Sequence, residues 1–310
     1  MAEIYGWVGK ILRIDLSSER IETMDTLPLA EKYLGGRGII ARIAWDELRD
    51  IDDPYDPENR LIIMTGPLTG TMAPSSGRTE FGTIAPQAYP KPWFTRSNMG
   101  GWFGSELKYA GYDGLIIQGK AEKPVYIKIE DENVEILDAG DIWGRDTFST
   151  QRYLMDHHGK DVKSICIGPA GENLARLAVI QSDTENAAGQ GGFGAVMGSK
   201  KLKAVTVKGS GGVRIADPET FLELCREIAK DYHWGNKKRP DPMDPKIGKI
   251  YSLKGLTCSH ACPWRCGWMW RNVPGKVYPG INKTYFMCVV PLLFGTYKFY
   301  DWNIGYEAGI

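Results

Sequence analysis

The chain has 310 residues, of which 43% are hydrophobic and 25% charged, an ordinary composition for a globular protein large enough for two domains. Its 38 Lys and Arg residues balance its 38 Asp and Glu residues, which argues against a nucleic-acid partner or a membrane surface. Six cysteines are few for a disulfide scaffold, and we see neither a secretory signal nor an apolar run of membrane-spanning length. We therefore expect a cytoplasmic protein with no membrane span.

The first 210 residues alternate short apolar segments with turns and contain few helical patterns. The spacing predicts a strand hairpin at 9–24, a helix over 39–48, and strands at 61–64 and 79–84. The next stretch contains strand patterns at 115–118, 162–167, 177–181 and 204–208, a hairpin at 125–137 and an amphipathic helix over 147–156. Many short strands with few helices indicate an α+β fold built largely on sheets.

A second domain is expected after the linker Ser210-Gly211-Gly212. Pro218–Asp231 has the apolar spacing of a helix, with Asp217 as its N-cap and Pro218 at its first position. The aromatic-rich stretch 294–310 offers no closing element. We expect residues 1–211 to form a sheet-rich N-terminal domain and residues 212–310 to form the start of a mostly helical domain, in a chain that is a fragment of a longer protein.

Two glycine-rich turns look like copies of one motif. The first runs from Ser97 to Gly104 and the second from Asn186 to Gly194. Each places an Asn, a Gly pair, an aromatic residue and another Gly before a short helical run that ends in Lys. Glycine lets backbone N–H groups approach a ligand closely, and a helix start adds unpaired donors that suit phosphate. The pair indicates a ligand with two phosphate-bearing halves or two related ligands; the alternative is two tight turns with nothing bound.

The second turn also satisfies the G-x-G-x-x-G pattern of dinucleotide-binding folds, over Gly189–Gly194. That pattern is informative only directly after a strand and with an acidic residue about 20 positions further on. A polar segment at 182–186 precedes the turn, and 210–214 contains no acidic residue. A dinucleotide-binding fold is therefore disfavoured.

Three cysteines lie close together at Cys258, Cys262 and Cys266, with three residues between each pair. Thiolates this close can converge on one metal centre, which favours a [4Fe-4S] cluster over structural zinc or unligated thiols. Both kinds of centre need four ligands, and His260 and Cys288 are the candidates for the fourth within the chain. Cys166 and Cys225 are expected to be core thiols.

These motifs resemble those of the tungsten-containing aldehyde:ferredoxin oxidoreductases. The resemblance covers nearly all of residues 5–212 and thins after residue 230, where the cysteine cluster is its main anchor. The matching stretches are Gly66–Thr71, Gly77-Arg78, Asn98–Gly101, Phe103–Lys108, Ala110–Asp113, Gly168–Asn173, Ala187–Gly189, Gly191-Gly192 and Gly194–Lys200.

The resemblance implies an oligomeric enzyme that oxidises small aldehydes to carboxylic acids on one tungsten (or molybdenum) held by two pyranopterins. A magnesium ion is expected to bridge the pterin phosphates, and a [4Fe-4S] cluster to pass electrons to ferredoxin or an electron-transfer subunit. The implied contacts of one pterin are Arg78, Asn98 and Gly100, and those of the other are Asn186, Ala187, Gly189 and Gln190. The backbone carbonyls of Asn98 and Ala187 are the implied magnesium ligands, and Cys258, Cys262 and Cys266 the implied cluster ligands.

The chain departs from the family pattern in four places. Positions 186 and 190 are often Arg in the family but are Asn and Gln here, so anion binding there must depend more on backbone N–H groups. Three residues separate Cys258 from Cys262, where the family usually has two. The 231–258 segment is shorter than expected. The family's fourth cluster cysteine and its substrate-side Glu and His lie beyond residue 310, so no catalytic residue is assigned.

Two alternatives remain beside aldehyde oxidation. The tungsten subunit of class II benzoyl-CoA reductases, a second branch of the superfamily, carries a protein thiolate on tungsten. Cys288, isolated in an apolar segment, is either that ligand or, as we favour, a buried structural thiol. In that branch the substrate is an acyl-CoA. The other alternative is a zinc-stabilised interaction protein with vacant glycine turns.

Overall fold

The computed structural model describes residues 4–182, 186–231, 252–263, 267–271 and 283–286. The chain forms two compact units: residues 1–221 together with 259–261 make up the first, and the remaining residues the second. The described elements form an α+β fold, as predicted, with two mixed six-stranded sheets in the first unit. No helix in these ranges is long and apolar enough to span a membrane. The domain boundary expected at residue 211 stays a prediction.

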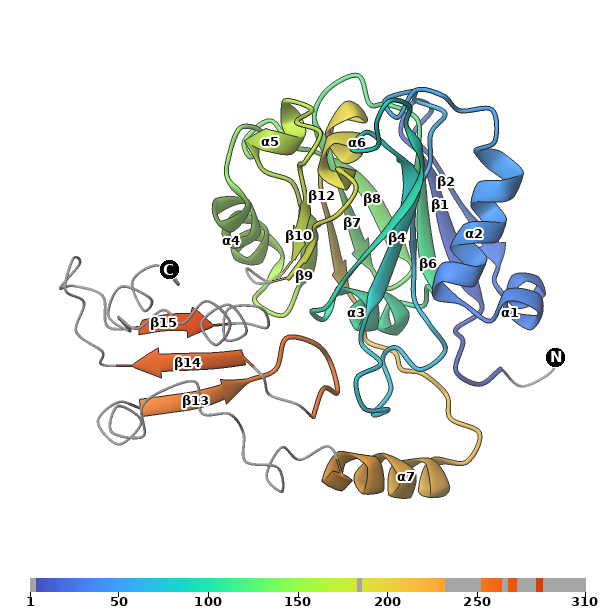
Figure 1. The fold of residues 1–310 in the computed structure, drawn as a ribbon, viewed down its shortest axis with the longest axis vertical. Coiled ribbons are helices and arrows are strands. Elements are labelled where there is room, and N and C mark those ends of the chain that lie inside the picture. Colours follow the sequence, from blue (N-terminus) through green and yellow to red (C-terminus); the bar gives the residue numbers. More distant parts are fainter. Residues whose placement is uncertain (1–3, 183–185, 232–251, 264–266, 272–282, 287–310) are drawn as a thin grey trace. The chain divides into compact units, whose positions relative to one another are not determined.

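The first sheet has the strand order β2-β1-β6-β3-β4-β5 (Figure 1). Its strands are β1 (Lys10–Asp15), β2 (Arg20–Asp25), β3 (Leu61–Met64), β4 (Thr79–Ala85), β5 (Trp93–Met99) and β6 (Gly114–Gln118). β1 and β6 run parallel, and all other neighbours are antiparallel. Every residue of β3 is buried, because both faces of the sheet are covered, and this explains its unbroken apolar sequence. The hairpin and strands predicted in this region are confirmed.

The second sheet has the order β11-β10-β9-β12-β7-β8. Its strands are β7 (Val125–Glu130), β8 (Asn133–Asp138), β9 (Lys163–Cys166), β10 (Ile180–Ser182), β11 (Asn186–Ala188) and β12 (Leu202–Lys208). Only β12 and β7 run parallel among these neighbours. The predicted hairpin at 125–137 and the strands at 162–167 and 204–208 are confirmed; the strand expected at 177–181 begins three residues later.

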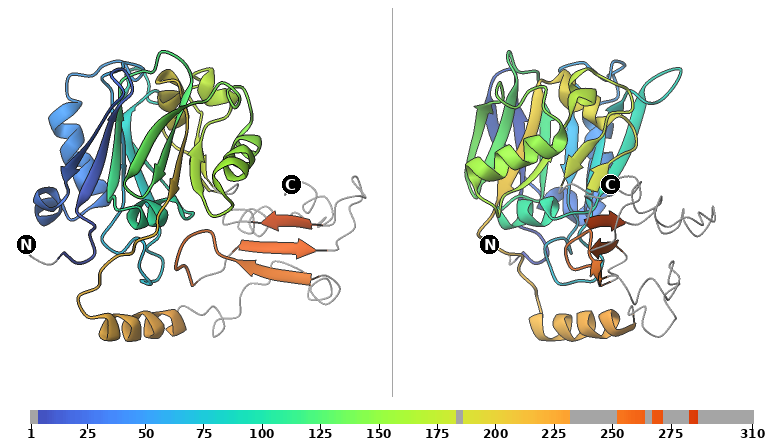
Figure 2. Two further views of the ribbon diagram at one scale, coloured as in Figure 1. Left: turned by 180° about the vertical axis from the view of Figure 1, so that it is seen from behind. Right: turned by 90° about the vertical axis from the view of Figure 1, so that its left-hand side faces the viewer.

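The two sheets pack face to face around one apolar core (Figure 2). Alternate residues such as Ile63 and Val205 face this core. Helices α1 (Leu27–Tyr33) and α2 (Gly36–Glu47) cover the outer face of the first sheet, and α4 (Thr147–His158) covers the outer face of the second. The predicted helices at 39–48 and 147–156 are confirmed, and the first unit is a four-layer structure.

Two short helices enter the space between the sheets at opposite ends (Figure 1). They are α3 (Phe103–Tyr109) and α6 (Phe193–Ser199), the helices that follow the two glycine turns. Each inserts a fully buried Phe at its start, Phe103 or Phe193. A further short helix, α5 (Pro169–Glu172), lies in the predicted 168–173 turn and packs against α6. The two turns are thus fixed to the core by the helices behind them.

Both glycine turns begin later than the sequence motif suggested. Ser97-Asn98-Met99 forms the end of β5, and Asn186–Ala188 forms β11. Ser182 ends β10 and Asn186 begins β11, so strands reach both ends of the polar 182–186 segment, because polar residues are tolerated in a strand at the edge of a sheet. β11 pairs antiparallel with β10, so the G-x-G-x-x-G pattern follows a hairpin and not the strand of a βαβ unit.

The second unit contains most of α7 (Pro218–Asp231), and the Asp217 carboxylate caps the helix as predicted by accepting from the Thr220 N–H at 3.1 Å. Three strands, β13 (Ser252–Leu256), β14 (Gly267–Arg271) and β15 (Lys283–Phe286), form an antiparallel sheet. The stretch 294–310 lies outside the described residues. The mostly helical character expected for 212–310 stays a prediction.

A buried ion pair fastens α5 to the second sheet. The side chains of Lys203 and Glu172 are 0% and 5% exposed. Glu172 also accepts from the Gly144 N–H at 2.9 and 3.0 Å, and Lys203 donates to the Arg145 carbonyl at 2.7 Å. The buried Lys203 ammonium and the buried Glu172 carboxylate are therefore charge partners, and removing either side chain would leave the other charge unpaired.

Lys203→Met is expected to lower the free energy of unfolding by about 3–5 kcal/mol, because it leaves the Glu172 carboxylate buried without its partner. Urea denaturation measures this loss. The matched control is Lys123→Met, which breaks the exposed Lys123–Asp138 pair and should have a much smaller effect. Equal losses in the two variants would show that burial of the pair does not matter.

Candidate cofactor site

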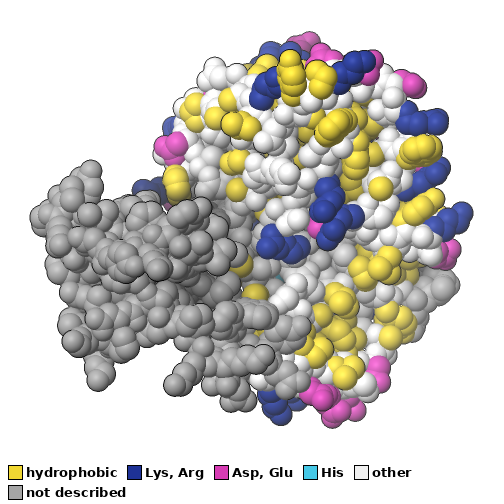
Figure 3. Space-filling view, in the orientation of Figure 1, with side chains coloured by type: hydrophobic (Ala, Val, Ile, Leu, Met, Phe, Trp, Pro, Cys, Tyr) yellow, Lys and Arg dark blue, Asp and Glu magenta, His cyan; other side chains and the backbone are white. Residues whose placement is uncertain are grey.

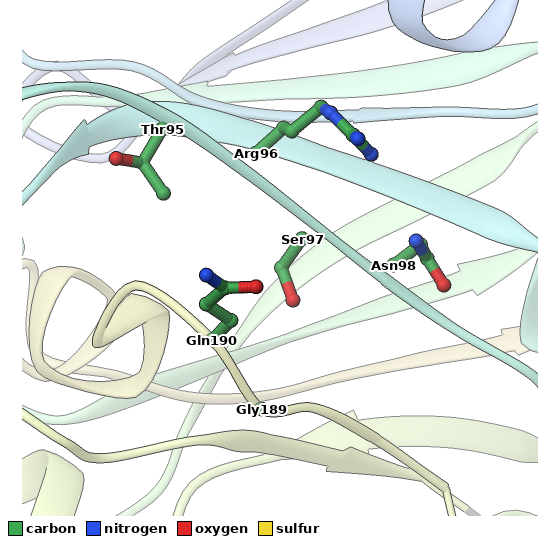
Figure 4. A pocket seen from close by; sticks show the side chains of 6 residues that line it. All are labelled: Thr95, Arg96, Ser97, Asn98, Gly189 and Gln190. Carbon is green, nitrogen blue, oxygen red and sulfur yellow. The ribbon is translucent and has the colours of Figure 1, made fainter.

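A pocket of about 510 Å³ lies where the edge strands of the two sheets contact each other (Figure 4). Four consecutive residues of β5, Thr95 to Asn98, line one side. Gly189 and Gln190, directly after β11, line the other. The structure thus brings the duplicated motifs together: Asn98 comes from the first motif, and Gly189 and Gln190 come from the second.

The pleat of β5 divides its side chains between two directions. Thr95 and Ser97 point toward the second turn, where Gln190 also points into the pocket, whereas Arg96 and Asn98 leave the strand on its other side (Figure 4). The Asn98 side-chain oxygen accepts from the Arg78 guanidinium at 2.6 Å. This hydrogen bond holds the Arg78 side chain beside Asn98, which lines the pocket.

The charge around this pocket is mainly positive. Arg37 and Arg96 both pair with Glu80 of β4, at 3.4 and 3.9 Å, so two guanidinium groups share one carboxylate. Figure 3 shows basic side chains gathered on this face over β4 and β5. Among the described residues that line the pocket, none is Asp or Glu. This excess of positive charge favours an anionic ligand.

The glycines of the second turn differ in what they do. Gly192 has φ +80°, and a Cβ there would lie 2.2 Å from the Arg176 carbonyl oxygen, so the fold itself requires glycine. Gly191 has φ +100°, and a Cβ there would lie 2.6 Å from the Phe193 ring. Gly189 is different, because a Cβ there would meet no described atom within 4 Å. Neither packing nor backbone conformation requires glycine at 189, which fits a backbone that faces a ligand.

The 86–92 loop holds the second turn in place. Gln87 donates its backbone N–H to the Gly191 carbonyl at 3.3 Å, and its side-chain oxygen accepts from the Gly191 N–H. Arg176 donates to the carbonyls of Pro86 and Ala88 at 2.7 and 2.9 Å. Sequence reasoning missed Gln87 and Arg176, since contacts between segments so far apart leave no local pattern.

The lysine that ends each motif is buried and supports the fold. Lys108 donates to loop carbonyls, including that of Gly66 at 3.0 Å, and lies 3.6 Å from Asp113. Lys200 donates to three loop carbonyls, including that of Asn59 at 2.6 Å. Burial lowers the pKa of Lys108 to about 8 and that of Lys200 to about 7. Neither lines the pocket, so this shared feature of the motifs reflects loop anchoring.

The other predicted pterin contacts lie next to the pocket along the chain but do not line it. Gly100 is buried directly after β5. In β11, Ala187 is exposed, and Asn186 is buried with a side-chain N–H₂ group that has no partner among the described residues. The pterin and magnesium roles of these residues stay predictions.

The cysteine cluster is described only in part. Cys258 and Cys262 are partly buried and form no disulfide among the described residues, and Cys266 and Cys288 lie outside the described residues. Within the described ranges, no group of three or more His, Cys, Asp or Glu residues is placed to hold a metal ion. The cluster ligands therefore stay a prediction. Cys166 and Cys225 are buried, as predicted for core thiols.

Residues 259–261, between the first two cysteines, belong to the first unit and adjoin the first glycine turn. Ser259 forms a parallel bridge with Gly101, and the His260 N–H donates to the Gly101 carbonyl at 3.3 Å. A Cβ on Gly77 would lie 2.3 Å from the Ser259 hydroxyl and 2.9 Å from the His260 carbonyl. Because Gly77 has no side chain, residues 259–261 can pack directly against it, next to Arg78 of the predicted site.

Comparison with known proteins supports the resemblance seen in the sequence. The family model for the N-terminal domain of aldehyde ferredoxin oxidoreductase matches residues 11–209. The tungsten-containing aldehyde ferredoxin oxidoreductase of Pyrococcus furiosus is 46% identical over 252 residues, which cover 79% of this chain and 40% of the relative. The WOR-like subunit of an aliphatic sulfonate oxidoreductase from the same organism is 37% identical over 246 residues, covering 74% of this chain and 39% of the relative.

A solved structure is similar over a longer stretch. It is the active-site complex BamBC of benzoyl coenzyme A reductase with 1,5-dienoyl-CoA, which matches with a TM-score of 0.81 and 29% identity over 98% of this chain and 52% of that chain. The chain spans about 40% of the length of the curated relatives that it matches. The family match over residues 11–209 shows that the chain belongs to the aldehyde ferredoxin oxidoreductase family.

Proposed function

We propose that the chain is the cofactor-binding part of a tungsten-dependent enzyme that oxidises small aldehydes to carboxylic acids. The observation that carries the proposal is the pocket in which the two glycine motifs meet, between β5 and the second turn. Its supporting context is 46% identity to a tungsten-containing aldehyde ferredoxin oxidoreductase. Electrons are expected to leave through a [4Fe-4S] cluster to ferredoxin or an electron-transfer subunit.

The residues around the pocket fit an anionic bis-pterin cofactor. The open position at Gly189 lets phosphate approach the backbone, and the described lining residues include Arg96 but no carboxylate. In this proposal Arg78, Asn98 and Gly100 hold one pterin. The other is held by Asn186, Ala187, Gly189 and Gln190. The carbonyls of Asn98 and Ala187 would bind the magnesium ion between the phosphates, as hard oxygen ligands suit that ion.

When bound, the tungsten cofactor would supply the two-electron chemistry that converts an aldehyde and water into a carboxylic acid, two protons and two electrons. The residues of this chain would bind and orient the cofactor. Arg78, fixed by its 2.6 Å bond to Asn98, is already placed before the cofactor binds. The thiols of Cys258, Cys262 and Cys266 would hold the cluster through which electrons leave one at a time.

A second candidate function is that of a benzoyl-CoA reductase. The observation in its favour is the structural similarity to the benzoyl coenzyme A reductase complex over 98% of this chain. The substrate would then be an acyl-CoA, and Cys288 a candidate ligand of the metal, since soft thiolates suit such metals.

A substrate assay on the full-length protein from its own host distinguishes the two candidates. Reduction of an artificial electron acceptor is measured with simple aldehydes and, separately, with a dienoyl-CoA. We expect aldehyde-dependent reduction, retained nearly in full by Cys288→Ser. Turnover with the dienoyl-CoA alone, lost in Cys288→Ser, would assign the chain to the second candidate.

A further inference from the structure

A histidine–tyrosine contact joins the cysteine segment to helix α3. The Nε2 atom of His260 lies 3.3 Å from the Tyr109 hydroxyl, and the two rings meet edge to face at 79°. Tyr109 is the last residue of α3, the helix behind the first glycine turn. Both residues belong to the first unit, so this contact lies within one compact body.

The hydroxyl of Tyr109 determines which nitrogen of His260 carries the proton. Tyr109 donates to the Gly70 carbonyl at 2.8 Å. A phenol has a single proton, so the same hydroxyl can only accept from His260, and Nε2 must be the donor. The Nδ1 atom is buried and has no partner among the described residues. The imidazole therefore donates its Nε2–H to Tyr109 of α3, and its remaining lone pair is on the buried Nδ1.

The backbone on both sides of His260 is also held. The His260 N–H donates to the Gly101 carbonyl at 3.3 Å, and the Ala261 carbonyl accepts from the Ser75 N–H at 3.2 Å. Three residues separate Cys258 from Cys262, and His260 is the middle one. Its side chain is therefore the natural anchor of the loop between the two cysteines.

We propose that His260 is a positioning residue of the cysteine cluster. Through Tyr109 it fastens the loop between Cys258 and Cys262 against the first glycine turn. The inference rests on the proposed function for the presence of the cluster. In this proposal the His260–Tyr109 contact fixes the conformation of the loop that carries the two cysteines.

The contact should affect the reduction potential of the cluster. Hydrogen bonds to the sulfurs and solvent exposure set that potential. Release of His260 would let water reach the loop between the cysteines. Water stabilises the more negative, reduced state, so the midpoint potential should rise.

The test is a redox titration, followed by electron paramagnetic resonance, of the full-length holoenzyme carrying Tyr109→Phe. This change removes one hydroxyl and keeps the ring. We expect unchanged iron content, a more positive midpoint potential and an altered cluster spectrum. The matched control is Tyr126→Phe, which breaks another Tyr–His hydrogen bond, to His158 at 3.0 Å, and should leave the potential unchanged.

Tyr109→Phe also removes the hydrogen bond from Tyr109 to the Gly70 carbonyl. Two variants of His260 leave that bond in place and therefore test the His260–Tyr109 contact alone. His260→Leu should raise the potential in the same direction, and adding Tyr109→Phe to it should give no further shift. His260→Gln keeps an N–H donor and should return the potential toward the wild-type value.

A wild-type potential in Tyr109→Phe, or an equal shift in Tyr126→Phe, overturns the inference. So does loss of iron from His260→Gln when Tyr109→Phe keeps it, because His260 would then be a ligand. A wild-type holoenzyme that contains no iron–sulfur cluster refutes the proposed function instead.

Discussion

Gly189→Val is expected to abolish pterin and tungsten binding while the protein stays folded. A Cβ at Gly189 would meet no described atom within 4 Å, so the space beside this backbone is open. The same side chain would project from a residue that lines the pocket and would keep phosphate away from the backbone. Pterin content measured by fluorescence after release should fall to the background level. Gly100→Val is expected to have the same effect on pterin content.

The matched control is Gly212→Val, because a Cβ at Gly212 also meets nothing within 4 Å and this glycine does not line the pocket. It should bind pterin like the wild type. Circular dichroism and the urea midpoint of all variants report whether the fold is retained. Full pterin content in folded Gly189→Val would show that the ligand does not approach this backbone.

Cys262→Ala and Cys266→Ala are each expected to remove the iron–sulfur cluster and its broad visible absorbance. Thiolates are the usual ligands of such clusters, and loss of one leaves an iron uncoordinated. Tungsten and pterin can remain, because their expected contacts lie in other residues. Iron per chain and electron transfer to an external acceptor are the measurements. Unchanged iron in both variants would refute the ligand assignment.

Cys258→Ser is the most informative of the cysteine variants, because the three-residue spacing to Cys262 is unusual for the family. We expect it to lose iron as well, since loss of one thiolate leaves an iron uncoordinated. Four retained irons would make another residue the third ligand, with His260 the first to examine. Cys225→Ser, which changes a buried thiol of α7, is the control and should keep its iron.

Much of the fold could be predicted because its central strands are buried on both faces. The run Leu61–Met64 is entirely apolar, and the pattern gave its bounds directly. The edge strands β5 and β11 were missed, because Thr95, Arg96 and Asn186 lack the apolar alternation of an inner strand. The pocket is lined by residues of β5 and of the turn after β11, so missing these strands also meant missing some of the residues that line it.

The candidate site could be predicted where the two motifs repeat each other. Asn98, Gly189 and Gln190 were named from the sequence, and they line one pocket. Arg96 stands two residues before Asn98 and would have been found if that segment had been read as a strand, whose alternate side chains share a face. Contacts between distant segments, such as Tyr109 with His260, leave no local signal and required the structure.

The most direct test of the proposed function is the metal and pterin content of the full-length protein purified from its own host. The proposal predicts tungsten (or molybdenum), pterin and about four irons per chain, the content of one [4Fe-4S] cluster. Zinc alone, with no pterin, would contradict it and would instead support a zinc-stabilised protein with vacant glycine turns.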